Sequence, residues 1–325
     1  MADFDVFNGD ADGICSLVQL RLAEPRKASL ITGVKRDIAL LDRVKAVAGD
    51  RVTVLDISME KNRSSLDILL QAEADVFYVD HHVAGDVPKS SRLTTIINEA
   101  PDVCTSLLVN SYLKGQFRAW AVVGAFGDNL KQSASRLAKS LQLKPDELKK
   151  LEELGTYLNY NGYGEQLEDL HFDPAELFKL TGSYANPLDF IRDDQQYFNC
   201  LSNGYHEDMM AVATVEAEQA SDSTAVFILP NSPWARRISG VFSNDLANRF
   251  PARAHAIVTE KAKGGYQVSV RAPLLNKSGA AELCQKFSSG GGRAAAAGIN
   301  QLSAAELEEF IRVFQAAYPL SAKTI

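Results

Sequence analysis

Residues 52–82, VTVLDISMEKNRSSLDILLQAEADVFYVDHH, contain the pattern that decides the fold. Two short β-rich runs, 52–57 and 76–79, flank a segment, 61–72, whose apolar residues recur with helical spacing. A strand, a helix and a second strand joined by short connections form a parallel pair, because the helix returns the chain to the starting edge. We therefore expect a parallel sheet with helices on its faces.

The same alternation extends outward from this unit. Further strands are predicted at 4–7, 28–34 and 94–97, and further helices at 14–22 and 38–48. Residues 102–197 are mostly helical in pattern, with a helix start near Pro145. Within them, 155–163 is rich in Tyr, Asn and Gly and predicts a loop, whose tyrosines either pack a helical connector or stack on bases.

A second α/β pattern begins near residue 206. It predicts strands at 225–229, 254–259 and 266–270, and helices at 240–249, from 280, and at 304–317. The length of 325 residues fits about two domains of ~150 residues each. We expect an α/β chain with one domain over 1–197, which includes the helical connector, and a second over 205–325.

Composition limits the class of protein. The chain is 46% hydrophobic and 23% charged, which is ordinary for a globular protein. No apolar run is long enough to span a membrane, and the acidic N-terminus predicts no secretory or transit peptide. The net charge of −7 argues against a broad basic surface for long nucleic acid. Cys15, Cys104, Cys200 and Cys284 show no metal-type spacing and predict reduced core thiols in a cytoplasmic protein.

Acids and histidines follow several predicted strands. They are Asp10 and Asp12 in GDADG (9–13), Asp56 in VTVLDIS (52–58), Asp80, His81 and His82 in VFYVDHH (76–82), and Asp128 in VVGAFGDN (122–129). Parallel strands end at one edge of a sheet, so most of these side chains are expected to gather there. Crowded carboxylates repel one another unless a cation offsets their charge. Oxygen ligands with one imidazole suit Mn²⁺ better than Mg²⁺.

Each of these residues also has a simpler interpretation. A single Asp after a strand, such as Asp12, is often only a helix cap, and a single His at a sheet edge is often a satisfied polar residue. Their combination on one edge favours the metal centre. Gly9 and Gly13 would permit the tight turn that holds Asp10 and Asp12.

These motifs resemble those of the DHH phosphoesterases. GDADG, LD at 55–56, DHH at 80–82 and GD at 127–128 stand in the order of the four family motifs. The C-terminal part, with VSVRAP at 268–273 and SSGGGRAAAAG at 288–298, resembles the associated DHHA1 domain. The resemblance covers nearly the whole chain and implies a catalytic site between the two domains. Members include single-strand exonucleases, nanoRNases, phosphodiesterases of cyclic or linear dinucleotides, and pyrophosphatases.

The resemblance assigns roles to individual residues. It implies that two Mn²⁺, with Mg²⁺ or Co²⁺ as substitutes, are held by Asp10, Asp12, Asp56, His81 and Asp128, with Asp56 bridging. It implies that His82 contacts the scissile phosphate and that Asp80 orients an imidazole. In the C-terminal domain, it implies that the far end of the substrate is held by Arg271, Gly290, Gly291, Gly292 and Arg293.

The sequence departs from the family at two positions. Val6 stands where many members have a metal-binding His, so that Asn8 is the candidate replacement and one metal site is expected to be weaker. Arg293 stands where the glycine motif usually ends in His. Its guanidinium suits a terminal phosphate or guanine O6 and N7, and the alternative is a salt bridge within the domain.

Within the family, length and charge favour a stand-alone hydrolase of linear dinucleotides, such as pGpG, or of very short RNA. Such an enzyme would release 5′-nucleoside monophosphates by a two-metal hydroxide mechanism. The alternatives are a single-strand exonuclease, a cyclic dinucleotide phosphodiesterase, or a nucleotide sensor without turnover. We expect a cytoplasmic monomer or homodimer that binds neither a membrane nor long nucleic acid.

Overall fold

The computed structural model describes residues 1–319. The chain divides into two compact units, Met1–Gly204 and Tyr205–Ile325. The division falls inside one helix, α9 (Gln195–Val212). Each unit contains its own β-sheet, the first parallel and the second mixed. The predicted α/β fold class is confirmed.

The first sheet positions the acids and histidines. In the described residues it has five parallel strands in the order β2-β1-β3-β4-β5. They are β1 (Asp3–Phe7), β2 (Ser29–Ile31), β3 (Arg51–Leu55), β4 (Asp75–Asp80) and β5 (Leu93–Ile97). All five predicted strands are present. Because they run in one direction, the residues that follow β1, β3 and β4 meet at one edge of the sheet.

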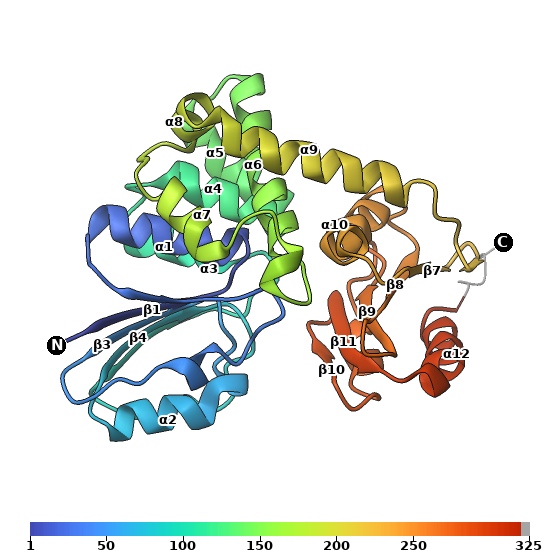
Figure 1. The fold of residues 1–325 in the computed structure, drawn as a ribbon, viewed down its shortest axis with the longest axis horizontal. Coiled ribbons are helices and arrows are strands. Elements are labelled where there is room, and N and C mark those ends of the chain that lie inside the picture. The colour runs from blue at the N-terminus through green and yellow to red at the C-terminus, as the bar shows by residue number, and fades with distance from the viewer. Residues whose placement is uncertain (320–325) are drawn as a thin grey trace. The chain divides into compact units, whose positions relative to one another are not determined.

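Helices cover both faces of this sheet (Figure 1), with α2 on one face and α1, α3 and α4 on the other. The helices that precede α9 are α1 (Ala11–Ala23), α2 (Arg63–Gln71), α3 (Thr105–Tyr112), α4 (Arg118–Gly127), α5 (Lys131–Ala138), α6 (Pro145–Gly162), α7 (Pro174–Thr181) and α8 (Pro187–Asp193). Val54 and Tyr78 on the sheet pack with Leu66 of α2 in one buried cluster. This burial follows from the apolar spacing that predicted the helix.

The helix predicted at 38–48 is wrong. Only a short 3₁₀ turn, Leu40–Arg43, forms there. The side chain of Asn62 explains the difference, because its Oδ1 accepts from the Leu41 N–H at 3.3 Å and its Nδ2 donates to the Ile38 carbonyl at 2.6 Å. A tertiary contact therefore satisfies backbone groups that a helix would have used.

The loop predicted at 155–163 is also wrong, because most of this run forms the end of α6. Its glycines allow close packing: a Cβ on Gly155 would lie 2.2 Å from the Val123 carbonyl oxygen of α4. The Asn161 side chain accepts from the backbone N–H groups of His171 and Phe172. Tyr157, Tyr160 and Tyr163 are buried, which agrees with packing of a helical connector rather than stacking on bases.

The second unit is built on a mixed sheet with the order β10-β11-β9-β8-β7-β6 among residues 205–319. Its strands are β6 (Gln219–Ala220), β7 (Thr224–Leu229), β8 (Ala254–Glu260), β9 (Tyr266–Arg271), β10 (Gly290–Gly292) and β11 (Ala296–Leu302). Its helices are α10 (Pro233–Arg249), α11 (Ala280–Cys284) and α12 (Leu307–Ala317). The strands predicted at 225–229, 254–259 and 266–270 are present, and β8 and β9 form an antiparallel hairpin.

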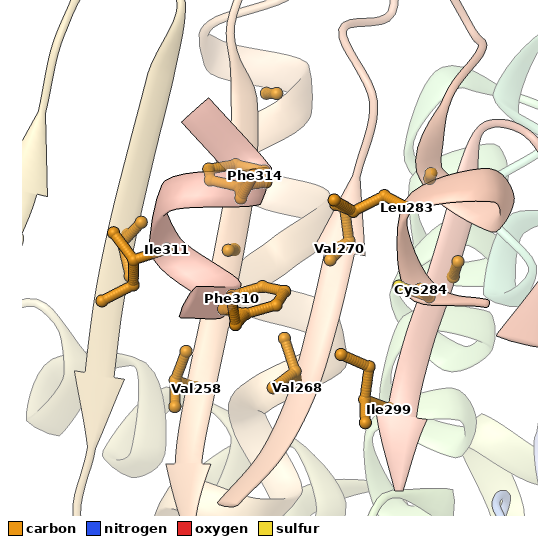
Figure 2. Packing of buried hydrophobic residues seen from close by; sticks show 14 of the residues in the cluster. Val258, Val268, Val270, Leu283, Cys284, Ile299, Phe310, Ile311 and Phe314 are labelled. Atoms are coloured by element: carbon orange, nitrogen blue, oxygen red, sulfur yellow. The ribbon is translucent and has the colours of Figure 1, made fainter. Parts of the chain in front are cut away.

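The core of the second unit lies between this sheet and α12. Figure 2 shows Phe310 and Phe314 of α12 beside Val258 and Val268 of the sheet. Phe310 and Phe314 are fully buried. The apolar stripe of the predicted final helix thus forms a separate core for this unit.

The structure shows which cysteines are buried and whether any described helix could span a membrane. Cys15, Cys104 and Cys284 are buried, but Cys200 is exposed on α9, so the prediction of a core thiol is wrong at that position. No helix within residues 1–319 combines the length and the apolar character needed to cross a bilayer.

His255 on β8 makes the stability of the second unit dependent on pH. It is fully buried, and its Nε2 accepts from Arg253 Nε at 3.1 Å. Its Nδ1 has no hydrogen-bond partner among the described residues. Burial, together with the nearby Arg253 charge, lowers the pKa of His255 from 6.5 to about 4.

We expect unfolding free energy to be insensitive to His255 above pH 6.5 and to fall as the pH drops towards 4. In that window the unfolded chain binds a proton that the folded chain does not bind, which costs up to about 3 kcal/mol. Urea unfolding of the wild type and of His255→Gln at pH 7.5 and 4.5 measures this difference. Equal pH dependence in the two proteins would contradict the expectation.

Candidate metal centre

The turn between β1 and α1 holds the first two acids. Asp10 caps α1, since its Oδ1 accepts from the N–H groups of Asp12 at 2.9 Å and Gly13 at 3.1 Å. A Cβ on Gly9 would lie 2.0 Å from the Gly33 carbonyl oxygen, and one on Gly13 would lie 2.2 Å from that of Asn8. Glycine is therefore required at both positions, because a side chain there would collide with a nearby backbone carbonyl.

Asp12 is held by a second helix. Its two carboxylate oxygens accept from the backbone N–H groups of Thr105 and Ser106, at 2.7 and 2.8 Å, where α3 begins. The side chain is almost completely buried. The capping interpretation is thus correct in part, but the helix that Asp12 caps is α3, while Asp10 caps α1. Both carboxylates are fixed in place by these backbone donors.

Asp56 and His81 approach each other at the carboxyl edge of the sheet. Asp56 follows β3 with φ of 59°, the left-handed region, which re-aims its side chain after the strand. His81 Nδ1 lies 2.8 Å from the Val103 carbonyl oxygen, so it carries the proton and donates there. His81 Nε2 faces the acids, 3.3 Å from Asp56 Oδ1, and in the neutral ring it carries the lone pair that can bind a metal ion.

Two further carboxylates complete the group around His81 Nε2. Asp12 Oδ2 and Asp128 Oδ2 each lie 4.0 Å from it. Asp128 follows the last residue of α4 rather than a strand. The packing of α4 therefore brings its side chain to the group. We refer to this set as the donor set: Asp12, Asp56, His81 and Asp128.

The donor set fits a divalent cation. Ligands about 2.1 Å from an octahedral ion lie about 3 Å apart when adjacent and about 4 Å apart when opposite. Asp56 Oδ1, 3.3 Å from His81 Nε2, lies near the adjacent spacing, and Asp12 Oδ2 and Asp128 Oδ2, each 4.0 Å from it, lie within about 1 Å of that spacing. Burial first, and then repulsion from Asp10 and Asp12, raises the pKa of Asp56 well above its ordinary value. A cation would remove that repulsion.

His82 stands beside the donor set with a different partner. Its Nδ1 lies 2.7 Å from Asp80 Oδ1 and 3.9 Å from Asp56 Oδ1. Asp56, His81 and His82 together bring ligand atoms within 4.8 Å of one another. However, the bond to Asp80 engages Nδ1, so His82 is better placed to use Nε2 towards a bound molecule. Burial favours a lower pKa for His82, but the Asp80 carboxylate outweighs it and raises the pKa.

Sequence reasoning missed Lys35, which follows β2. Its Nζ donates to Asp10 Oδ2 at 2.5 Å and to Asn159 Oδ1 of α6 at 2.8 Å. Burial alone would lower the pKa of Lys35, but Asp10 and Tyr163 raise it, so the ammonium stays charged. The same ion pair lowers the pKa of Asp10, against the effect of its burial. The rule that ligands gather where parallel strands end would have indicated Lys35.

Asn8, the candidate replacement for the missing His, uses its amide locally. Its Oδ1 accepts from the Asp10 N–H and its Nδ2 donates to the Lys35 carbonyl, both at 3.2 Å. Its role as a ligand therefore stays a prediction, as does the number of Mn²⁺ ions at the centre.

The predicted substrate residues lie in the second unit. Arg271 ends β9, and its Nε donates to Asn244 Oδ1 of α10 at 2.7 Å.

The glycine run forms β10, which stands at one end of the strand order. A Cβ on Gly290 would lie 1.7 Å from the Cys284 carbonyl oxygen, whereas one on Gly291 would meet no atom within 4 Å. Glycine is thus required at position 290 by close packing, whereas a side chain at position 291 would enter open space. The Arg293 N–H donates to the Ala296 carbonyl at the following turn.

Several solved structures share the fold of this chain. No protein-family model and no curated protein matches the sequence. Among solved structures, the exonuclease RecJ bound to manganese has a TM-score of 0.62 at 16% identity, over 98% of this chain and 91% of that chain. The pGpG-specific phosphodiesterase PggH from Vibrio cholerae has a TM-score of 0.54 at 14% identity, over 97% and 98%. An exopolyphosphatase-related protein from Bacteroides fragilis has a TM-score of 0.52 at 17% identity, over 97% and 91%.

These likenesses extend over both units and establish the fold of the chain. It is a two-unit α/β fold with a parallel sheet followed by a mixed sheet. More particularly, it is the fold of RecJ and of PggH. The resemblance to DHH/DHHA1 phosphoesterases that was predicted from the motifs is confirmed in the fold.

Proposed function

We propose that this protein is a metal-dependent phosphodiesterase that hydrolyses linear dinucleotides or very short RNA to 5′-nucleoside monophosphates. The observation that carries the proposal is the donor set itself, in which oxygens of three carboxylates lie within 4.0 Å of Nε2 of one imidazole. The shared fold with a manganese-bound exonuclease and a pGpG-specific phosphodiesterase supports phosphodiester chemistry.

The donor set would hold the catalytic ion. A bound divalent cation supplies Lewis-acid polarisation of a phosphoryl oxygen and lowers the pKa of water. The imidazole ligand favours Mn²⁺ over Mg²⁺. The N–H of His82, oriented by Asp80, would donate to a phosphoryl oxygen and offset the charge that develops there.

A short substrate agrees with the charge of the chain. A net charge of −7 disfavours binding of a long polyanion, which needs many cationic groups, whereas a dinucleotide needs only a few. We propose that Arg271 of β9, the glycine run of β10 and Arg293, which follows that run, bind the end of the substrate away from the metal. Guanine is the proposed base, because the Arg293 guanidinium matches O6 and N7.

A hydrolysis panel with Mn²⁺ tests this function. It compares pGpG, pApA, cyclic dinucleotides, short RNA, pyrophosphate and long single-stranded DNA, each with a chelator control. We expect turnover of the linear dinucleotides or short RNA that chelation abolishes and Mn²⁺ restores best. Preferred degradation of long DNA would instead indicate an exonuclease, and tight binding without turnover would indicate a nucleotide sensor.

Arg271→Ala is expected to raise KM for the dinucleotide strongly while Mn²⁺ binding stays intact. The reason is that Arg271 belongs to the second unit, whereas the donor set belongs to the first. Asn244→Ala serves as the control for the Arg271–Asn244 hydrogen bond, since it removes that bond and keeps the charge. An unchanged KM in Arg271→Ala would remove this residue from the substrate site.

Arg293→His is expected to keep hydrolysis but to reduce any preference for pGpG over pApA. The guanidinium pairs with O6 and N7 of guanine, which is worth roughly 1–3 kcal/mol of discrimination, whereas adenine presents a donor in place of O6. The ratio of kcat/KM for the two dinucleotides, in wild type and variant, measures this. An unchanged ratio would exclude base recognition by Arg293.

A further inference from the structure

Lys35 is fixed against Asp10 by its backbone as well as by its side chain. Its N–H donates to the Gly162 carbonyl at 2.7 Å, and its own carbonyl accepts from Asn8 Nδ2 at 3.2 Å. Its ammonium group meets Asp10 Oδ2 and Asn159 Oδ1 and lies 5.3 Å from the centre of the Tyr163 ring. The two residues that flank this ammonium, Asn159 and Tyr163, are both buried.

Asp10 differs from the carboxylates of the donor set in having the Lys35 ammonium as a partner. Its Oδ1 already accepts two backbone N–H groups at the start of α1. Its Oδ2 accepts the Lys35 ammonium. Of the side chains within four residues of Asp10, Asp12 belongs to the donor set, Val6 has no ligand atom, and the Asn8 amide is engaged by backbone groups.

We propose that the Lys35 ammonium takes the place of a second divalent cation at Asp10, so that the centre holds one resident ion, bound by the donor set. Lys35 is then a positioning residue that supplies a fixed positive charge beside the ion. The inference rests on the proposed metal centre, but it is independent of which phosphodiester is the substrate.

The charge of the Lys35 ammonium and its fixed position explain why it would bind Asp10 in preference to a divalent cation. A charge-assisted hydrogen bond to a buried carboxylate is stronger than a neutral one. Because both backbone groups of Lys35 are bonded, the ammonium is held beside Asp10 at high effective concentration. A divalent cation at the same oxygen would have to displace Lys35 and would then lie close to a like charge.

The first experiment measures Mn²⁺ stoichiometry in the whole chain by equilibrium dialysis with metal analysis. We expect about one tightly bound ion in the wild type. In Lys35→Met we expect a second ion to bind at least on the order of tenfold more tightly than it binds to the wild type, because a like charge has been removed. Lys131→Met is the matched control, since Lys131 pairs with Glu152 on the surface and its loss should leave the stoichiometry unchanged.

Paramagnetic resonance gives a second readout on the same samples. The wild type loaded with Mn²⁺ should show the hyperfine pattern of an isolated ion, and Lys35→Met at high Mn²⁺ should show a spin-coupled pair. Two tightly bound, coupled ions in the wild type would overturn the proposal. No tight ion in the wild type would overturn the proposed metal centre itself, so the two failures are distinguishable.

A comparison of two asparagine variants keeps the proposal testable if Lys35→Met does not fold. Asp12→Asn removes a carboxylate of the donor set, whereas Asp10→Asn removes the charge that pairs with Lys35 and keeps an Oδ1 that can cap α1. We expect Asp12→Asn to weaken binding of the tight Mn²⁺ by at least on the order of tenfold to a hundredfold, and Asp10→Asn to change it much less. Equal weakening in both variants would assign Asp10 to the resident ion and refute the proposal.

Discussion

Asp56→Asn is expected to reduce phosphodiester turnover by at least on the order of 10²–10³, because the variant loses the central negative charge of the donor set. Asp56 Oδ1 lies nearest of the three carboxylates to His81 Nε2, at 3.3 Å, and also accepts from Thr105 Oγ1 at 3.2 Å. Asparagine is the informative replacement. It keeps the shape of the side chain and tolerates the left-handed backbone at this position, where φ is 59°.

The same variant should be more stable than the wild type without metal. The pKa of Asp56 is raised above its ordinary value near 3.8, so the ionised carboxylate destabilises the folded state as the pH rises above that value. At neutral pH, Asp56→Asn removes this cost. We therefore expect a higher Tm for the metal-free variant, and a Tm increase on addition of Mn²⁺ in the wild type but not in the variant.

Asp50→Asn is the matched control. Asp50 is also a buried carboxylate of the first unit, but it accepts from the backbone N–H groups of Ala2 and Val47 away from the donor set. Its replacement should lower stability and leave Mn²⁺ binding and turnover per folded molecule unchanged. Near-wild-type turnover in Asp56→Asn would show that the donor set is not the catalytic centre.

His82→Ala is expected to lower kcat by on the order of 10²–10³, the cost typical of one electrostatic donor in the transition state. The Mn²⁺ content should stay as in the wild type, since the Nδ1 of His82 is bonded to Asp80 and the residue is not in the donor set. Metal analysis and steady-state kinetics on the same preparation separate the two roles. Loss of the ion in His82→Ala would mean that His82, rather than His81, is the ligand.

Asp80→Asn tests the orientation of His82 without removing it. The Asp80 carboxylate raises the pKa of His82 against the effect of burial, so the protonated form persists to higher pH. If that form is the donor, kcat falls as the pH rises through this pKa. In Asp80→Asn the fall should shift to lower pH, and a profile with no shift would contradict the assigned partnership.

Much of the fold could be predicted from the sequence because local pattern and tertiary environment agree there. The alternation in residues 52–82 predicts a parallel pair, and β3, α2 and β4 follow it closely. The gathering of Asp56, Asp80 and His81 then follows from topology, since parallel strands end at one edge. The failures at 38–48 and 155–163 both arise from tertiary contacts, because Asn62 binds the backbone of the first segment, and in the second Asn161 binds a distant backbone and Gly155 packs closely against α4.

The members of the donor set could be identified from the sequence alone, because strand ends and motif order are properties of the chain. Which nitrogen of His81 faces the acids depends on the Val103 carbonyl, a contact that forms only in the folded chain. Packing also brings Lys35 to Asp10, 25 residues away in the sequence, and to Asn159, 124 residues away. The physical reason is that hydrogen bonds and ion pairs between distant segments depend on packing in space, which leaves no periodic signal in the sequence.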